Sequence, residues 1–145
     1  RFGCTYIDRD GSAQTPVVIH RVIYGSMERF IGILLEHTAG ALPVWLAPVQ
    51  AALIPITDDH VGYTQEVAKQ LRKAGIRAEV DETTKRMNAK IREAQGQKIP
   101  YMLVVGKREM AAGQVAVRLR SGEDLGAMAV AEFVALAQEA IAAKT

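Results

Sequence analysis

Beyond residue 43, short apolar runs alternate with amphipathic segments, and this alternation constrains the fold more than any other feature of the chain. Repeated strand–helix–strand order predicts an α/β fold, with a mixed, largely parallel β-sheet covered by helices. The expected strands are residues 49–56, 76–80, 101–105 and 115–119. Three helices are expected: one between the first two strands, one at 85–97 and one at about 129–143. The last two strands are expected to pair across a loop at Gly106–Gly113.

The three helices carry apolar residues at helical spacing. The first is expected to begin after a cap at Thr57 or Asp58 and to stop at Gly75. In helix 85–97, the apolar residues Met87, Ile91 and Ala94 are expected to point inward, and the basic residues Arg86 and Lys90 outward. The last helix is expected to bury Val130, Phe133, Val134, Ala137 and Ile141.

Residues 1–40 show a different pattern. A polar tip at residues 8–12, between two extended segments, predicts a hairpin. Residues 17–23 are apolar and rich in β-branched side chains, so we expect a strand buried on both faces. Helix 26–38 is apolar over most of its surface, which is typical of an internal helix, and Gly40 is expected at its C′ position.

Length and composition limit the class of protein. The chain's 145 residues suit one domain, or one domain with part of another, and linker-like residues 41–43 divide them into 1–42 and 43–145. An apolar share of 49% with 23% charged residues is typical of a globular protein. No apolar run approaches the roughly 18–20 residues of a membrane helix, so no membrane partner is expected. A single cysteine, Cys4, excludes an internal disulfide and favours a cytoplasmic location.

Positive charge is concentrated in residues 81–120. This segment holds nine lysines and arginines against four acidic residues, so it carries +5 while the rest of the chain carries −3. Clustered positive charge is typical of a surface that binds a polyanion. A solvated face on which the charges cluster by chance is an equal alternative.

A turn at Gly25 and Ser26 precedes helix 26–38. Gly25 lets the backbone approach a ligand closely, and Ser26 can cap the helix or bind a phosphate. Arg29 lies in the first helical turn, where an arginine is unfavourable to the helix dipole unless an anion is near. An ion pair of Arg29 with Glu28 or Glu36 is the alternative.

His20 lies in the apolar run before this turn, where a lone histidine is more often a packed core residue than a metal ligand. The block His20-Arg-x-x-x-Gly-Ser-x-Glu-Arg-Phe, however, resembles the third signature motif of class II aminoacyl-tRNA synthetases, and the threonyl-tRNA synthetase family in particular. The resemblance implies that His20 is one of three protein ligands of a zinc ion, Zn2+, the other two lying upstream of Arg1. It also implies that Arg29 and Ser26 contact ATP, which binds with Mg2+.

The second part resembles the anticodon-binding domain shared by the threonyl, prolyl, histidyl and glycyl synthetases. The resemblance is carried by Trp45-Leu-Ala-Pro-Val-Gln50, Ala74-Gly-Ile-Arg77, Lys90-Ile-Arg92, Ile99-Pro-Tyr101-Met-Leu-Val-Val-Gly106 and Gly113-x-Val-Ala-Val-Arg118. It implies a five-stranded sheet, preceded in residues 1–42 by a strand–helix remnant of the antiparallel catalytic core. It further implies that the anticodon loop meets Lys90, Arg92, Lys98, Glu109 and Arg118.

Four positions depart from the family pattern, and one of them is Lys98, which stands where an arginine is common. Val22 stands where alanine or glycine is usual, close to the amino-acid pocket. Thr83 and Thr84 stand where an arginine and a polar residue such as asparagine are usual. Lys85 and Arg86 keep the positive charge beside them, so we expect phosphate contacts to persist more securely than base-specific ones.

Together the two resemblances imply the C-terminal part of a threonine–tRNA ligase, inactive alone. It would bind the anticodon region of threonine tRNA and contribute the third motif to ATP-dependent threonylation. In the intact enzyme the partners would be threonine, ATP, the tRNA and a second subunit of a homodimer. One alternative is a free-standing tRNA-binding or regulatory module, and another is a non-enzymatic scaffold on the same fold.

Overall fold

The computed structural model describes residues 2–145 and divides into two units between Ile33 and Leu34. In the first unit, β1 (Tyr6–Ile7) pairs with the antiparallel strand β2 (Ala13–Gln14). The tip between them is closed by a hydrogen bond of 2.9 Å from the Asp8 backbone N–H to the Ser12 carbonyl. The predicted hairpin is therefore confirmed.

The prediction of a buried strand at residues 17–23 is wrong in this structure. These residues belong to no strand, and their side chains are exposed, that of Val17 to 90%. A β-strand requires a neighbour with which to exchange backbone hydrogen bonds. Among the described residues of the first unit, β1 and β2 form the only such pair, so residues 17–23 have none.

Helix α1 (Met27–Thr38) confirms the helix predicted at residues 26–38. None of its residues is buried, although its sequence is typical of an internal helix. At its end, the Gly40 N–H donates to the Leu35 carbonyl at 2.9 Å and the Ala39 N–H to the Glu36 carbonyl at 3.2 Å. This pair of bonds is the Schellman motif, so the C′ residue is Ala39, with φ of +49°, rather than the expected Gly40.

The second unit is built on a five-stranded mixed sheet in the order β4-β3-β5-β6-β7. Its strands are β3 (Ala51–Pro55), β4 (Ala78–Val80), β5 (Tyr101–Val105), β6 (Gln114–Leu119) and β7 (Asp124–Ala129). The expected α/β fold and mixed sheet are confirmed. Strand β3 pairs in parallel with β4 and β5, whereas β6 pairs antiparallel with β5 and β7. Two of the four strand pairings are therefore parallel, whereas a largely parallel sheet was expected.

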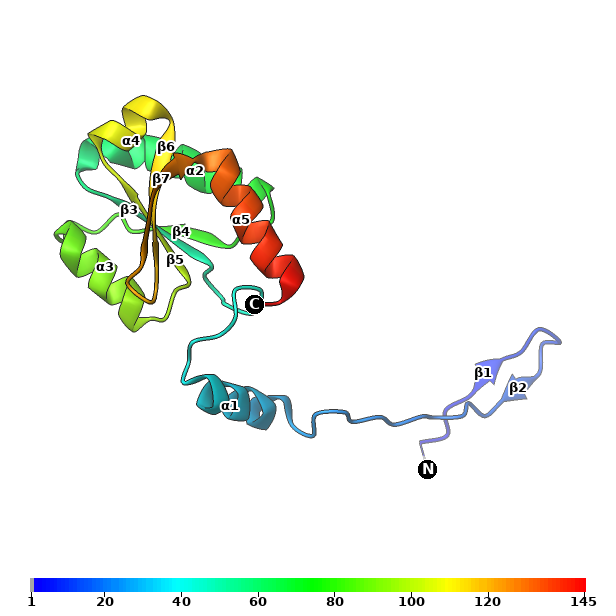
Figure 1. The fold of residues 1–145 in the computed structure, drawn as a ribbon. Helices are drawn as coiled ribbons and strands as arrows, with labels where there is room; N and C mark the ends of the chain where they lie inside the picture. The colour runs from blue at the N-terminus through cyan, green and yellow to red at the C-terminus, as the bar shows by residue number, and fades with distance from the viewer. Residues whose placement is uncertain (1) are drawn as a thin grey trace. The chain divides into compact units, whose positions relative to one another are not determined.

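Helices cover both faces of this sheet (Figure 1). On one face lie α2 (Val61–Lys73), which follows the short 3-10 helix η1 (Asp58–His60), and α5 (Val130–Ala143). Their buried side chains pack on the sheet in the larger core, which includes Val67, Leu71, Phe133, Ala137, Leu53, Leu103, Val115 and Val117. On the other face, α3 (Met87–Gly96) forms a smaller core with Ala52, Ile54, Met102 and Val104.

The loop expected at Gly106–Gly113 contains a helix, α4 (Lys107–Ala112). The Glu109 carboxylate reaches back to accept the Gly106 backbone N–H at 2.9 Å, which caps the first turn of this helix. Gly113 ends the helix in the left-handed conformation, with φ of +67°. The short helix is thus stabilised by the Glu109 cap at its start and by Gly113 at its end. The expectation of a loop did not take these two caps into account.

Candidate nucleic-acid interface

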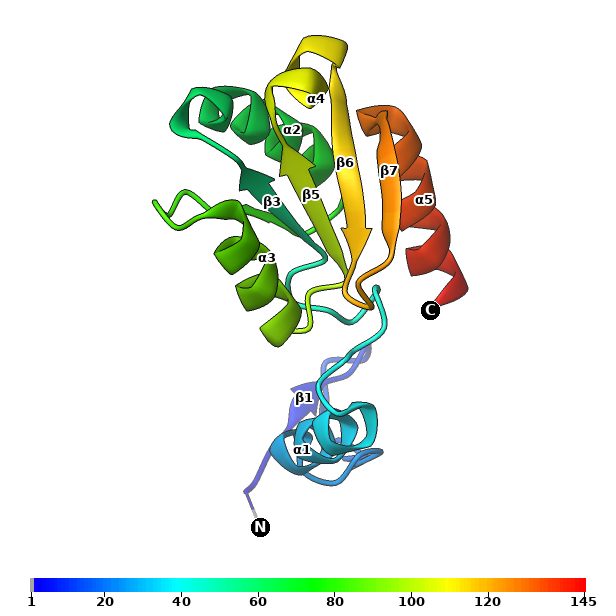
Figure 2. The same ribbon diagram turned by 60° about the vertical axis from the view of Figure 1, so that its left-hand side comes forward.

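Within the second unit, no described helix lies over part of the sheet face that carries α3. Helix α3 packs over β3 and β5, whereas β6 and β7 lie open beside it (Figure 2). Val115 and Val117 of β6 point into the larger core, so the alternating residues Ala116 and Arg118 point to the α3 side. The register confirms this placement, because Arg118 lies opposite Met102, a residue of the α3-side core.

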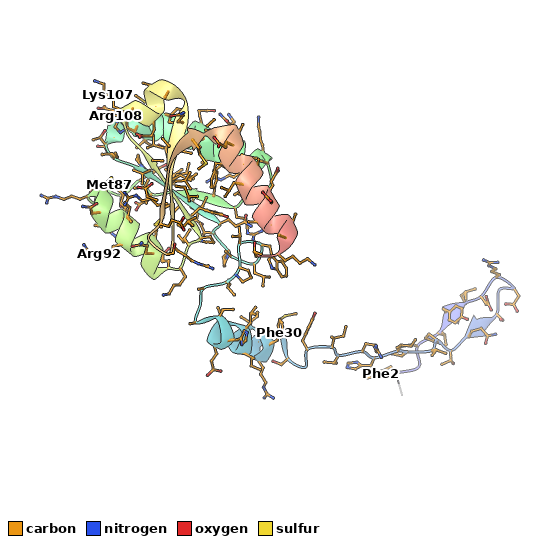
Figure 3. All side chains as sticks on the ribbon, in the orientation of Figure 1. Phe2, Phe30, Met87, Arg92, Lys107 and Arg108 are labelled. Carbon is orange, nitrogen blue, oxygen red and sulfur yellow. The ribbon has the colours of Figure 1, made fainter. Side chains whose placement is uncertain are left out.

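Five of the nine basic residues in segment 81–120 are exposed and have no carboxylate within 4.0 Å among the described residues. We call these side chains the basic surface: Arg86, Arg92, Lys98, Lys107 and Arg108. They come from the start of α3, its exposed side, the turn after it and α4. Figure 3 shows Arg92, Lys107 and Arg108 on the same side of the second unit in that view.

The other four basic residues have partners within the protein. Lys85 donates to Glu93 at 2.6 Å, and this carboxylate raises the pKa of Lys85. Arg118 forms an ion pair of 2.8 Å with Asp124 and remains about half exposed. Arg120 donates to the Leu42 carbonyl at 2.6 Å, so it ties the linker to the sheet. The fourth is Lys90.

Lys90 does not point outward as expected. Its side chain is only 5% exposed, and its Nζ donates to the Asp81 backbone carbonyl at 2.8 Å. The reason is visible in the spacing: Lys90 stands at i+3 from Met87 and directly before Ile91, within the inward stripe of the helix. Helical spacing alone therefore contained the signal that this lysine faces the sheet.

The remaining predicted residues on this side are accessible. Arg92 is exposed on α3, and Lys98 is exposed just beyond the helix, with φ of +60°. Glu109 is half-buried and held by Gly106, so one carboxylate oxygen is engaged and the other can accept a further hydrogen bond. The contacts of all these residues with RNA stay predictions.

Gly106 lies where no larger residue fits without rearrangement. A Cβ atom there would be 2.8 Å from Cδ1 of Ile56 and 3.0 Å from Oε2 of Glu109. The glycine thereby leaves room for the Glu109 carboxylate to accept the Gly106 backbone N–H at 2.9 Å.

In the first unit, Ser26 acts as the N-cap of α1. Its Oγ accepts the Arg29 backbone N–H at 3.2 Å and donates to Glu28 at 2.8 Å. The Glu28 pKa is lowered, chiefly by its own backbone N–H and also by Ser26. The Arg29 side chain is exposed, and among the described residues it makes no ion pair with Glu28 or Glu36.

The described residues contain no group of three or more His, Cys, Asp or Glu side chains that could hold a metal ion. His20 is exposed and has no partner ligands among them. Its role as a zinc ligand, and the roles of Arg29 and Ser26 in ATP binding, stay predictions. None of the described helices is long and apolar enough to cross a membrane.

The mixed sheet, its open strands and the basic surface beside them form an α/β domain with the features expected of a surface that binds a polyanion. A family model described as "Anticodon binding domain" matches residues 50–140. The chain belongs to this anticodon-binding domain family.

Two threonine–tRNA ligases are similar to most or all of the chain, including residues outside 50–140. A threonine–tRNA ligase of Desulforamulus reducens is 54% identical over 145 residues, which are 100% of this chain and 23% of that protein. A threonine–tRNA ligase of Thermus thermophilus is 54% identical over 134 residues, which are 92% of this chain and 20% of that protein. The chain therefore spans about a fifth to a quarter of the length of these relatives.

Two solved structures resemble the fold. The RNA-binding domain of threonyl-tRNA synthetase from Cryptosporidium parvum matches 90% of this chain and 33% of that one, with a TM-score of 0.75 and 34% identity. Prolyl-tRNA synthetase from the same organism matches 70% of this chain and 22% of that one, with a TM-score of 0.62. At 24% identity, the second likeness shows the fold alone.

Proposed function

We propose that this chain is the C-terminal part of a threonine–tRNA ligase and binds the anticodon region of threonine tRNA. The observation that carries the proposal is 54% identity to a threonine–tRNA ligase over 100% of the chain. The family match at residues 50–140 lies within the second unit and supports a binding role for that unit. In domain terms, residues 43–145 bind the anticodon and residues 1–42 end the catalytic domain.

The chemistry of the basic surface suits a tRNA loop. Its unpaired arginines and lysines attract backbone phosphates and set the orientation of the RNA, but they carry little sequence information. Glu109 can accept a hydrogen bond from the donor edge of an unstacked base, and Arg118 can donate to one from the open strand β6. In this proposal Arg92 and Lys98 hold the loop, while Glu109 and Arg118 discriminate between bases.

The first unit supports a catalytic role only as part of a longer enzyme. The apolar residues 17–23 lack strand neighbours, and α1 buries none of its side chains, so both need further surfaces to pack against. We propose that Arg29 and Ser26 contact ATP with its Mg2+ there, and that His20 supplies one ligand of Zn2+. The ligase would then work as a cytoplasmic homodimer on threonine, ATP and tRNA.

The test is binding of this chain to the anticodon stem-loop of threonine tRNA and to a stem-loop of equal length with a permuted anticodon. Both titrations are repeated over a series of salt concentrations. We expect tighter binding of the cognate loop at every salt concentration, because base contacts add to the phosphate contacts. Equal affinity for the two loops, falling steeply with salt, would contradict anticodon recognition and leave only phosphate binding.

A further inference from the structure

Lys90 is the only lysine, arginine, aspartate or glutamate that is buried in the described part of the chain. Burying an ammonium group is costly unless hydrogen bonds and a nearby negative charge compensate for the lost water. A residue kept at such a cost in a small domain calls for an explanation. Its contacts supply one.

The Nζ atom of Lys90 joins α3 to the carboxyl ends of two neighbouring strands. It donates to the Asp81 carbonyl, just after β4, at 2.8 Å, and lies 3.5 Å from the Pro55 carbonyl at the end of β3. The Asp81 carboxylate lies 4.0 Å away. The N–H donors of the Lys90 ammonium group are therefore directed at acceptors within the protein.

Asp81 in turn holds the segment that leads into α3. Its Oδ1 accepts the Thr83 backbone N–H at 3.0 Å and the Thr83 hydroxyl at 2.5 Å, and its own N–H donates to the Leu53 carbonyl at 2.9 Å. Residues 81–86, which we call the entry loop, are thus fixed at one end through Asp81. Lys90 fixes the helix that follows to the same residue.

The entry loop and α3 carry two of the five residues of the basic surface, Arg86 and Arg92. Both side chains are exposed, so the position of their charges depends on the loop and on the first turns of the helix. We propose that Lys90 is a positioning residue for RNA binding: it holds the entry loop and α3 in place and does not itself contact the RNA. This inference rests on the proposed function.

Direct contact is the rival explanation. A hollow of about 200 Å³ between α3 and β4 is lined by Lys90, Asp81 and Thr83, and an RNA phosphate entering it would approach the ammonium group. The two explanations differ in salt dependence. Removing a phosphate contact lowers the slope of log K against log salt by about one unit, whereas removing an internal contact leaves the slope unchanged.

The experiment compares Lys90→Met with Arg92→Met, an exposed residue of the same helix, in binding the cognate and permuted stem-loops over a salt series. Hydrogen exchange of the entry-loop amides is measured on each variant without RNA. For Lys90→Met we expect about tenfold weaker binding of the cognate loop, because ordering one or two loop residues on binding has a cost of this size. We also expect a smaller preference over the permuted loop, an unchanged salt slope and faster exchange in the entry loop.

Arg92→Met should lower the salt slope and leave entry-loop exchange unchanged. Lys90→Arg keeps the buried charge, so it should recover part of the preference for the cognate loop. A loss of global stability alone would not change this preference in the molecules that remain folded. A lower salt slope for Lys90→Met with normal loop exchange would overturn the proposal in favour of direct contact. Unchanged binding and exchange would overturn it as well.

Two other outcomes are a Lys90→Met variant that does not fold and an unmodified chain that shows no preference for the cognate loop. If Lys90→Met does not fold, Thr83→Val is used instead, because it removes a hydrogen bond to Asp81 from an exposed position of the same loop. This variant should bind the cognate loop more weakly at an unchanged salt slope. A normal affinity would overturn the proposal. If the unmodified chain shows no preference for the cognate loop, the proposed function fails separately. Entry-loop exchange in Lys90→Met then decides whether Lys90 holds the loop.

Discussion

Phe133→Ala is expected to lower the free energy of unfolding of the second unit by about 3–5 kcal/mol. Phe133 is fully buried and is the largest such side chain in the described core. It projects from α5 and meets the Tyr101 ring edge to face, with centroids 5.3 Å apart and ring planes at 85°. Its removal leaves a cavity between the last helix and the central strand β5, and the surrounding side chains can fill it only in part.

Urea denaturation followed by far-ultraviolet circular dichroism measures this loss. Domains of this size are stable by only about 5–15 kcal/mol, so the variant will unfold at a much lower urea concentration. Ile141→Val, a partly buried position on the same helix, serves as the matched control and should cost about 0.5–1.5 kcal/mol. Equal losses for the two variants would contradict a core centred on Phe133.

Reversing two charges of the basic surface should have the largest effect on RNA binding. Arg92→Glu combined with Lys98→Glu is expected to weaken binding of the cognate stem-loop on the order of 100-fold at low salt, because two phosphate contacts become repulsive. The slope of log K against log salt should also fall by about two units. Both side chains are exposed and unpaired within the described chain, so the fold should not change.

Lys69→Glu combined with Lys73→Glu provides the control for this variant. It changes the net charge by the same amount, on α2, which covers the opposite face of the sheet. Because long-range attraction depends on net charge but contact depends on position, the control should weaken binding only slightly. An equal loss for both double variants would show that the effect is one of net charge and that the basic surface is not the contact.

The strands and longer helices could be predicted because their apolar residues recur at regular spacing. Strand β5 is a continuous apolar run, and α5 has a clear buried stripe, so both were found. Strand β7 was missed, since Gly126, Ala127 and the exposed Asp124 give it little alternation. Helix α4 was missed because it spans only six residues and depends on its caps.

Residues 17–23 show a different limit of sequence-based prediction. Their β-branched composition favours a strand, but a strand also needs partners for its backbone groups. Composition describes what a segment can form, whereas pairing depends on which other segments lie beside it. The exposed, unpaired form of these residues could therefore not be read from their own sequence.

The role of the candidate site stays a prediction, and the structure adds which of its basic residues are already engaged within the protein. The charge count pointed to segment 81–120, but it could not tell which basic residues were already engaged. Arg120 ties down the linker, Lys85 is paired with Glu93, and Lys90 is buried beneath the entry loop. Only the three-dimensional arrangement separates these internal contacts from the exposed charges that remain available to a ligand.

The most direct test of the central claim is a map of backbone amide chemical-shift changes in the isotope-labelled chain during titration with the cognate anticodon stem-loop. If the basic surface and the open strands bind the anticodon, the largest changes will fall in the entry loop, α3, α4 and β6. Amides of α2 and α5, on the other face of the sheet, will change little. The largest changes in α2 and α5 would contradict the account.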